Sequence, residues 1–565
     1  MKIKTLLIVL ISIMLILVTL FILLLNSPKE EKEIKNPIVV IVLGKNYNEI
    51  KENLLIWQET VEKETNQTVI LKVYSEDISA DEIKTEIKSL EEKYNVAGII
   101  FFGHIPYYLA GQNCNEITSL TSPCINYYYD SNTNVVSLDP DANPLKFLEN
   151  LMPTDAIYAD LDDHCSKKTY YEKEVYYMDS CNLIQKNSPF WIARITPPTE
   201  DIKEENQLIN DYLKKNYEYR TGKKETLDRV LMYIPISYQI SNQEITDVVG
   251  ILKNKFINLL YQETPINSKE EINEEGVNEY KCDLDLSSFN EIDDSKSWMY
   301  KNNQLTLLLP CEEDNSDKRF LEEISKPYEY VIYNGHGSPT EMQLEMTKEN
   351  FSKENKAIMY NMFSCTLGRF NEESYMAGEI LFNTEALIVK AAQMPIVGYL
   401  ADFQTEEIYL LKRGNMSIGG IQKFSNENMF SREIFGDPTL KLKQTGGNIK
   451  NPEVEISNKL INFGKIDSSS LETIKKNITI KNTGTEELEI KMLNSAYYFH
   501  SIDGKSYLIR LTENNILISP GKSKILTFEL ENEDYIGESL GQILLITNNP
   551  QNAAIILDYK LDILN

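Results

Sequence analysis

A histidine and a cysteine each follow an apolar run in the middle of the chain. His336 lies between two glycines after residues 330–333, and Cys365 follows residues 357–363. The two side chains are 29 residues apart, a spacing that suits a strand, a crossover and a parallel strand. The carboxyl ends of parallel strands meet at one sheet edge, where ligands bind in open α/β sheets. We therefore expect His336 and Cys365 to lie together at such an edge.

This pair of side chains can perform nucleophilic acyl chemistry. A thiol with a pKa of about 8.5 is mostly protonated at neutral pH, and a neighbouring imidazole can take its proton as the sulfur attacks a substrate. Cys365 would attack an acyl carbon, and His336 would protonate the leaving amine and later activate water. Backbone N–H groups at Gly337 and Cys365 would stabilise the oxyanion. The alternative that spacing leaves open is a turn histidine and a buried cysteine.

Two further histidines have other interpretations. His104 also follows an apolar run and a glycine, but an Ile-Pro dipeptide comes next and no cysteine stands at a comparable strand end, so we interpret it as structural. His164 follows an acidic turn that contains Asp160 and Asp162. Clustered carboxylate oxygens suit Ca²⁺. This turn is therefore a candidate calcium site, with a solvated loop as the alternative.

Strands and helices that would position these residues alternate from about residue 37 to residue 443. Apolar runs at 37–44 and 96–103 end in glycine and flank acidic amphipathic stretches. A capping-box spacing opens a predicted helix at Ser241 with Glu244 three residues later. Further apolar runs stand at 229–235, 330–333, 357–363 and 395–400. The alternation predicts an α/β fold with one or two doubly wound, mostly parallel sheets.

The pattern changes after the Gly-rich polar stretch at residues 444–448. Short alternating strands such as 477–481 and 525–530 follow, separated by turn sequences at intervals typical of a β-sandwich. The segment holds no evident metal cluster, charge block or repeat, and His500 has no local partner in the sequence. We interpret residues 446–565 as an all-β module that acts as a spacer or an adhesion surface.

The amino terminus predicts export. Residues 5–28 are uncharged and rich in Leu and Ile, long enough to cross a hydrocarbon core of about 30 Å as a helix. Lys2 and Lys4 precede this stretch and favour an inside amino terminus, which places the rest of the chain outside the cytoplasm. We expect a single-pass membrane anchor. A cleaved signal peptide, which would release a secreted protein, is the alternative.

Composition and cysteine count agree with an exported globular protein. The chain has 565 residues and a net charge of −28, which repels phosphate backbones and makes nucleic acid an unfavourable partner. Seven cysteines in an oxidising compartment suggest disulfides. The most local pairing is Cys114 with Cys124, Cys165 with Cys181, and Cys282 with Cys311, which leaves Cys365 as a thiol. Buried free thiols are the alternative.

Four motifs, which occur along the chain in the order found in that family, resemble the gingipain-like cysteine peptidases, a family with a caspase-like fold. They are a strand followed by His-Gly at 336–337, a strand followed by Ser-Cys at 364–365 and continuing to Phe370, an aspartate- and tyrosine-rich segment at 154–163 followed by 192–195, and Gly-Asp-Pro at 436–438. The turns of residues 446–565 likewise resemble immunoglobulin-like domains of the ASH/HYDIN type. The resemblance to the peptidase family covers about residues 37–442. It implies peptide-bond hydrolysis by Cys365 and His336, main-chain oxyanion donors and calcium binding.

The sequence thus predicts a membrane anchor at 1–28, an amino-terminal α/β subdomain at 29–200, a catalytic caspase-like subdomain at 201–445 and an immunoglobulin-like sandwich at 446–565. The predicted function is an extracytoplasmic cysteine endopeptidase that acts on protein or peptide substrates and needs no cofactor for its chemistry. One alternative is a non-catalytic adhesion or assembly scaffold that binds a surface or partner protein through the carboxyl-terminal module. Another is a peptide-acyl transferase, which would pass the same thioester to an amine.

Overall fold

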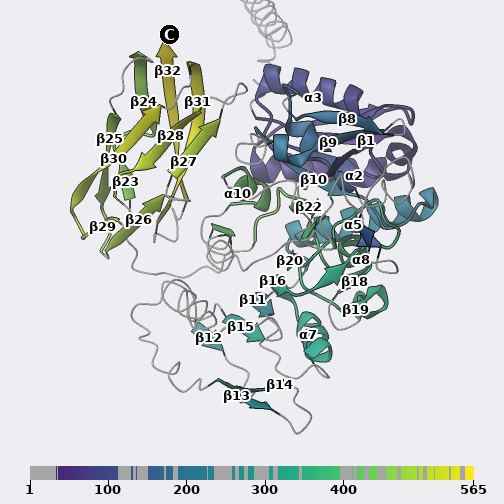
Figure 1. Ribbon diagram of the computed structural model, residues 1–565. Coiled ribbons are helices and arrows are strands. Elements are labelled where there is room, and N and C mark those ends of the chain that lie inside the picture. The colour runs from purple at the N-terminus through teal and green to yellow at the C-terminus, as the bar shows by residue number, and fades with distance from the viewer. Residues whose placement is uncertain are drawn as a thin grey trace, which may run out of the picture.

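Apolar strands that are buried on both faces form the centre of the protein. The computed structural model describes residues 34–564 except 112–128, 131–134, 137–150, 182–188, 234–257, 261–265, 273–277, 285–303, 309–315, 395–406, 412–415, 425–431, 443–453, 468–472, 501–505, 548–553 and gaps of one to three residues. Within this part of the chain the fold is mixed α/β, with many strands and few helices (Figure 1).

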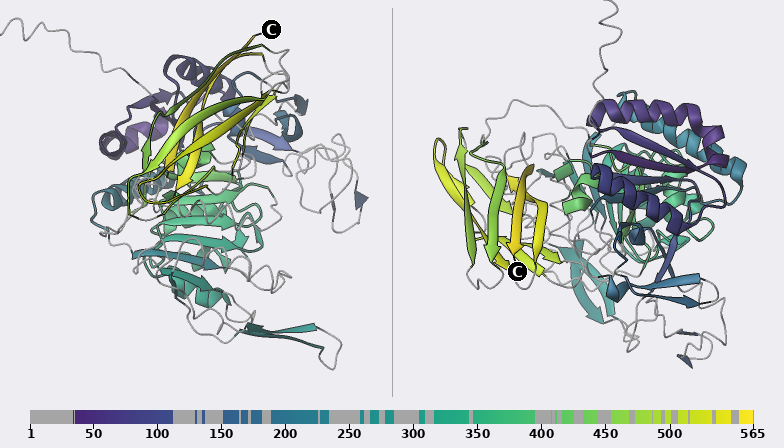
Figure 2. Two further views of the ribbon diagram at one scale, coloured as in Figure 1. Left: turned by 90° about the vertical axis from the view of Figure 1, so that its left-hand side faces the viewer. Right: turned by 90° about the horizontal axis from the view of Figure 1, so that it is seen from above.

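One sheet of 11 strands runs through the α/β part of the protein (Figures 1 and 2). Strands from both predicted subdomains enter it: β10, β3, β1 and β2 come from residues 29–200, and the other seven strands come from residues 201–445. The spatial order is β12 (Asn258–Leu260), β15 (Gln304–Leu308), β11 (Leu227–Tyr233), β16 (Tyr328–Asn334), β20 (Met359–Phe363), β21 (Ile388–Ala392), β22 (Arg432–Gly436), β10 (Trp191–Ile195), β3 (Gly98–Phe102), β1 (Ile38–Leu43) and β2 (Val69–Tyr74).

Strand direction reverses once across this sheet. The five strands from β22 to β2 are parallel to one another, and so are the six strands from β12 to β21. The two sets meet where β21 pairs with β22 in antiparallel register, with Ile388 opposite Gly436. The sheet is therefore mostly parallel, as predicted. Because the sets oppose each other, their carboxyl ends lie at opposite edges.

Helices cover this sheet through spaced apolar side chains. On α2, Ile50, Leu54, Trp57 and Val61 recur at helical spacing and are buried. Ser79 and Glu82 form a capping box at the start of α3. Side chains of α2 and α5 share a core with Ile38, Val40 and Val42, whereas α3 packs with the alternate residues of β1. The helices are α2 (Gly44–Thr65), α3 (Ala80–Tyr94), α5 (Ile202–Arg220), α7 (Ser316–Ile324), α8 (Met376–Asn383) and α10 (Ile418–Phe424).

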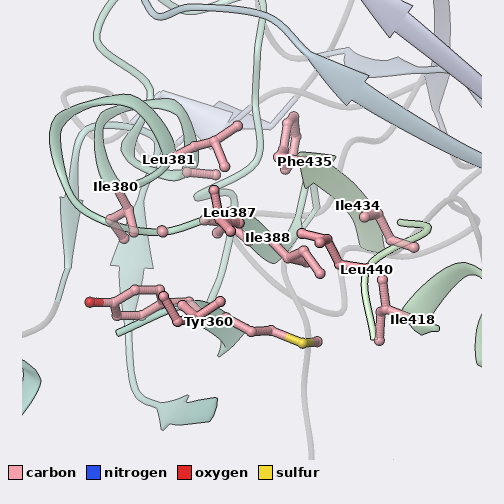
Figure 3. Close-up of a cluster of buried hydrophobic side chains, with 14 of the residues drawn as sticks. Tyr360, Ile380, Leu381, Leu387, Ile388, Ile418, Ile434, Phe435 and Leu440 are labelled. Carbon is pink, nitrogen blue, oxygen red and sulfur yellow. The ribbon is translucent and has the colours of Figure 1, made fainter. Parts of the chain in front are cut away.

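The core around β21 and β22 joins the two strand sets. Ile380 and Leu381 of α8 pack with Leu387, Ile434 and Phe435, all of which are buried (Figure 3). These side chains come from segments that are distant in sequence. Their burial fixes the strands whose ends carry the candidate site.

Smaller strands surround the main sheet. β17 (Gly337–Ser338), β18 (Glu341–Met342) and β19 (Met346–Thr347) form a small antiparallel sheet that begins immediately after His336. The other minor strands are β4 (Tyr108–Gly111), β5 (Tyr129–Asp130), β6 (Val135–Val136), β7 (Met152–Thr154), β8 (Lys167–Tyr170), β9 (Lys173–Tyr177), β13 (Ile266–Ile272) and β14 (Asn278–Leu284).

The carboxyl-terminal residues form two five-stranded sheets with a common core of apolar side chains, which confirms the predicted sandwich. The outer face of β31 also contributes Leu544 and Ile546 to the core of the α/β part. One sheet contains β23 (Val454–Ile456), β25 (Ile474–Asn482), β27 (Ala496–His500), β28 (Ser506–Leu511) and β30 (Ser523–Asn532). The other contains β24 (Leu460–Asp467), β26 (Leu488–Met492), β29 (Ile516–Ile518), β31 (Gly537–Thr547) and β32 (Ala554–Leu564).

Several sequence predictions fall on residues that the structure does not describe. They are the apolar segment 5–28, the helix predicted from Ser241, the run 395–400, and the pairing of Cys114 with Cys124 and of Cys282 with Cys311. Among the helices that are described, none combines the length and the apolar character needed to span a membrane.

Candidate active site

His336 and Cys365 follow the ends of two neighbouring parallel strands. β16 pairs with β20 so that Asn334 lies beside Phe363, and the Gly335 N–H donates a hydrogen bond to the Phe363 carbonyl at 3.0 Å. His336 and Cys365 each stand two residues beyond this last pair. Adjacent strands are about 4.8 Å apart, so equal offsets place the two residues side by side at one sheet edge. The sequence spacing predicted this arrangement.

Both residues are accessible at this edge. His336 is exposed, and Cys365 is half-buried and forms no disulfide bond with another described cysteine. A thiol that reacts with a substrate must reach it from a partly open position. The half-buried position of Cys365 agrees with that requirement.

Gly337 brings the His-Gly turn against the Ser-Cys turn. A Cβ atom at residue 337 would lie 2.3 Å from Ser364 Oγ, 2.9 Å from Leu367 Cδ2 and 3.2 Å from the Cys365 carbonyl oxygen. Only a glycine leaves room for this approach without movement of its neighbours. The predicted oxyanion donors, the N–H groups of Gly337 and Cys365, therefore belong to two main-chain segments that are in contact.

A strained turn holds the main chain after Cys365. Thr366 has φ +56°, a left-handed conformation that is unusual for a β-branched residue. Its N–H donates to the Met394 carbonyl at 3.4 Å, and the Gly368 N–H donates to the Ala392 carbonyl at 2.7 Å. The end of β21 thus anchors this turn on the side of Cys365 opposite to His336. Strain of this kind is concentrated at functional sites.

A buried polar network fixes the three strands that reach this edge. Lys390 Nζ of β21 lies 2.8 Å from Glu407 Oε2, and both side chains are buried. The Tyr330 hydroxyl of β16 and the Asn361 side-chain amide of β20 donate to Glu407 Oε1 at 2.5 and 2.9 Å. Glu407 therefore ties β16, β20 and β21 together. Sequence analysis missed this network, although a lysine within an apolar strand was a visible signal.

The segments at 154–163 and 192–195, which resemble the peptidase family, meet in a buried ion pair. Arg194 donates to both carboxylate oxygens of Asp155, from Nε at 2.8 Å and from Nη2 at 2.5 Å. The Asp155 N–H donates to Glu433 Oε1 at 2.8 Å. Burial and the nearby Asp155 raise the pKa of Glu433 well above its usual range. Burial raises the pKa of Asp155 as well, and the neighbouring Arg194 counteracts this rise.

The Gly-Asp-Pro motif has a structural role in this arrangement. Asp437 is fully buried and accepts hydrogen bonds from Trp57 Nε1 at 2.7 Å, Asn216 Nδ2 at 3.0 Å and Arg220 Nη2 at 2.7 Å. It also accepts from the main-chain N–H and the hydroxyl of Thr439, at 2.9 and 2.6 Å. One carboxylate therefore joins α2, α5 and the turn after β22.

His104 lies at the other edge of the sheet. Its Nδ1 is 3.0 Å from Glu205 Oε1, and its main-chain N–H donates to the same oxygen at 3.0 Å. Gly103, at φ +78°, permits the turn that follows β3. The geometry agrees with the structural interpretation of His104, since it is held by a buried glutamate and lies away from Cys365.

The acidic turn at 160–163 is occupied by lysine contacts. Asp160 Oδ2 accepts the Cys165 N–H at 3.0 Å and lies 3.9 Å from Lys84 Nζ, and Asp162 Oδ1 lies 3.2 Å from Lys88 Nζ. No group of three or more His, Cys, Asp or Glu side chains is arranged to hold a metal within the described ranges. These contacts do not add support for calcium at Asp160 and Asp162, which stays a sequence prediction.

The predicted pairing of Cys165 with Cys181 is confirmed by a disulfide bond between them. It closes the loop that carries β8 and β9, next to the acidic turn. Both cysteines are buried in the core beside α3.

Comparisons with known proteins assign neither a family nor a function. No family model matches the chain, and no curated protein matches it. Among solved structures, the chain is similar to the ASH / PapD-like domain of human CEP192, with 16% identity over 22% of this chain and 94% of that one, and a TM-score of 0.17. It is also similar to a protein of unknown function from Porphyromonas gingivalis, with 17% identity over 23% and 55% of the two chains and a TM-score of 0.16.

A longer but equally distant match is a beta-glucosidase from Listeria innocua solved with glucose, with 11% identity over 64% of this chain and 55% of that one, and a TM-score of 0.18. Likeness at this level identifies neither a shared fold nor a shared activity. The chemistry of this chain is therefore inferred from its own residues.

Proposed function

We propose that this chain is a cysteine endopeptidase of the gingipain-like, caspase-like type, with Cys365 as nucleophile and His336 as general acid and base. The observation that carries the proposal is the parallel register of β16 and β20. It sets His336 and Cys365 at equal distances beyond the paired residues Asn334 and Phe363. The partial exposure of Cys365 and the close approach of the Gly337 turn to the Cys365 turn support the same assignment.

In the proposed reaction the Cys365 sulfur attacks the carbonyl carbon of a peptide bond as His336 takes the thiol proton. The C–N bond then breaks, and the proton moves from His336 to the leaving amine. Water, deprotonated by His336, attacks the thioester and releases the carboxylic acid and the thiol. Atoms and electrons balance without an oxidant or a cofactor.

Main-chain N–H groups at Gly337 and Cys365 donate hydrogen bonds to the oxyanion in this proposal. Because a Cβ atom at residue 337 would lie only 3.2 Å from the Cys365 carbonyl oxygen, the two turns are packed closely against each other. The strained Thr366 and its hydrogen bond to Met394 hold the Cys365 main chain from the other side. Preorganised donors of this kind need no rearrangement as charge develops on the substrate.

The remaining parts of the chain have supporting roles in the proposal. The apolar segment 5–28 anchors the enzyme in the membrane, with the bulk of the protein outside the cytoplasm, or is removed so that the enzyme is secreted. The carboxyl-terminal sandwich is an ASH-type, immunoglobulin-like spacer. Its packing through Leu544 and Ile546 against the α/β core supports a fixed attachment.

Activity-based labelling tests the proposal. The full-length protein is treated with acyloxymethyl ketone probes that carry Arg, Lys, Asp or Asn, with calcium and reductant present. We expect one probe to modify Cys365, and we expect labelling to disappear in Cys365→Ala and His336→Ala. His500→Ala, in β27 of the sandwich, is the matched histidine control and should label like the wild type.

Product analysis separates hydrolysis from acyl transfer. Mass spectrometry of a cleaved protein substrate in H₂¹⁸O should show ¹⁸O in the new carboxyl termini, because water resolves the thioester. Ligated peptides without ¹⁸O would instead identify a transferase. If no probe labels Cys365, or if labelling persists in His336→Ala, the dyad assignment is wrong and the non-catalytic scaffold becomes the better reading.

A further inference from the structure

A lysine, an asparagine and a glutamate meet inside the main sheet. Asn361 of β20 and Lys390 of β21 are directly paired across the two parallel strands, so their side chains stand on the same face of the sheet. Lys390 Nζ is 2.8 Å from Glu407 Oε2, and the Asn361 side-chain amide donates to the other oxygen, Oε1, at 2.9 Å. One carboxylate therefore holds an amine and a carboxamide beside each other.

Burial gives this group an environment that excludes solvent. Lys390 is 1% exposed, and both Asn361 and Glu407 are 0% exposed. Two opposite charges in such surroundings carry a large desolvation cost. Transfer of one proton from Nζ to the carboxylate removes both charges and leaves an amine beside a carboxylic acid. The amine is the form of lysine that acts as a nucleophile.

The carboxamide is oriented and polarised by its neighbours. Its nitrogen faces Glu407 Oε1 and donates to the Tyr330 hydroxyl at 2.6 Å, which assigns the two ends of the amide. Asn361 Oδ1 accepts a hydrogen bond from Nη2 of the buried Arg432. The Arg432 guanidinium lies 3.8 Å from the Phe363 ring centroid, a second contact that fixes its position. A positive charge at Oδ1 makes Cγ more electrophilic and stabilises negative charge that develops on the oxygen.

These contacts supply a nucleophile, an electrophile, an acid–base group and an oxyanion partner. We propose that an intramolecular isopeptide bond joins Lys390 Nζ to Asn361 Cγ. Glu407 is the acid and base of this reaction, since it touches both the nitrogen that attacks and the nitrogen that leaves. Arg432 stabilises the charge on Oδ1.

The reaction is a transamidation that releases ammonia. Glu407 takes a proton from the Lys390 ammonium, and the nitrogen lone pair forms a bond to Asn361 Cγ while the carbonyl electrons move to Oδ1. Glu407 then passes the proton to Nδ2, the carbonyl forms again, and the Cγ–Nδ2 bond breaks. Glu407 relays the remaining surplus proton from Nζ to the ammonia that leaves. The products are one secondary amide and one ammonium ion, with no oxidation or reduction.

The bond would join two strands that lead to the candidate active site. β20 ends just before Cys365, and the Met394 carbonyl beyond β21 accepts the Thr366 N–H. A covalent link between these strands would resist their separation when the noncovalent contacts of the sheet are broken. The proposal uses neither Cys365 nor His336, so it does not depend on peptidase activity.

Mass spectrometry of the full-length protein, denatured and reduced after purification, tests the proposal. Trypsin should leave residues 357–369, which contain Asn361, joined to residues 370–412, because a modified Lys390 no longer directs cleavage. The joined species should be lighter by one ammonia molecule than its two parts together. Fragmentation should place the link at Asn361 and Lys390.

Variants separate the chemistry from simple loss of folding. Lys390→Arg and Asn361→Ala should abolish the link. Asn361→Asp should form it with loss of water in place of ammonia, an outcome that only a folded protein can give. Glu407→Gln should slow formation at least about 100-fold, the usual contribution of a general acid and base. Lys84→Arg changes another buried lysine that is paired with a carboxylate, and it should link like the wild type.

Separate peptides 357–369 and 370–390 from the wild type would overturn the proposal, because cleavage after Lys390 requires a free amine. A link that forms as fast in Glu407→Gln as in the wild type would overturn the role of Glu407. Neither result depends on labelling of Cys365. Absence of the link would likewise leave the peptidase proposal unchanged.

Discussion

Substitution of Gly337 by alanine should destabilise the protein through one identifiable contact. The new Cβ atom would lie 2.3 Å from Ser364 Oγ, which is much closer than a van der Waals contact allows. The backbone at Gly337 lies outside the left-handed region, so the cost is steric and not conformational. Overpacking of a buried site typically costs about 1–3 kcal/mol. We expect Gly337→Ala to lower the free energy of unfolding by about 2 kcal/mol.

A second substitution should reverse most of this loss. Ser364 Oγ is buried and has no hydrogen-bond partner among the residues described, so Ser364→Ala alone should be nearly neutral or slightly stabilising. In the double variant the closest contact disappears, and the next one, Leu367 Cδ2 at 2.9 Å, is the end of a flexible side chain. The coupling between the two substitutions should be about 1–2 kcal/mol, as for residues in direct contact.

Urea unfolding followed by tryptophan fluorescence measures these changes. Trp57 and Trp191 are both buried in the α/β core, and the sandwich contains no tryptophan, so the signal reports on the part that carries the site. Gly44→Ala is the matched control, because its Cβ would meet only the Tyr74 carbonyl at an ordinary 3.5 Å. A coupling below about 0.5 kcal/mol would refute the contact between the His-Gly and Ser-Cys turns.

Two further predictions concern the framework around the site. Asp437→Asn should cost about 3 kcal/mol, because it removes the fully buried one of the two carboxylates, Asp437 and Glu64, that pair with Arg220. Burial alone would raise the pKa of Asp437, but Arg220 and the hydrogen-bond donors outweigh burial and lower it. The stability of the wild type should therefore fall as pH drops below about 4, and the stability of the variant should fall less; equal acid unfolding curves would contradict this role. Replacement of Cys165 and Cys181 by alanine should lower the unfolding free energy by about 3 kcal/mol for a sequence separation of 16, and peptide mapping without reductant should find the two cysteine-containing fragments linked; unlinked fragments would disprove the bond.

The placement of His336 and Cys365 at one sheet edge was predictable because its signals are local. Apolar runs that end at His336 and Cys365 identify two strands, and parallel strands bring their carboxyl ends together. Apolar runs likewise locate β1 and β3 within the predicted ranges, and β11 begins two residues before its predicted range. The sandwich was also predictable from a local signal, the alternation of polar and apolar residues after residue 446.

Features that depend on distant partners were missed. β21 (Ile388–Ala392) has Lys390 at its centre, and a charge in a short apolar run argues against a buried strand. The charge is tolerated because Glu407 pairs with it. No local pattern shows that pairing, nor the burial of Arg194 against Asp155. The acidic turn at 160–163 was misleading for a similar reason: its carboxylates suggest a cation site in the sequence, but in the structure they contact lysines of α3, more than 70 residues earlier in the chain.

The position of β22 has a consequence for synthesis of the protein. β22 lies between β10 and β21 in the sheet. One edge of β10 therefore has no hydrogen-bonding partner strand until residues 432–436 leave the ribosome, about 240 residues after β10 itself. At about 5–20 residues per second this takes about 12–48 seconds. During that interval the nascent amino-terminal strands expose unpaired backbone groups that invite aggregation. A chaperone or continuous export of the growing chain would protect them, and truncation before residue 432 should yield an insoluble product.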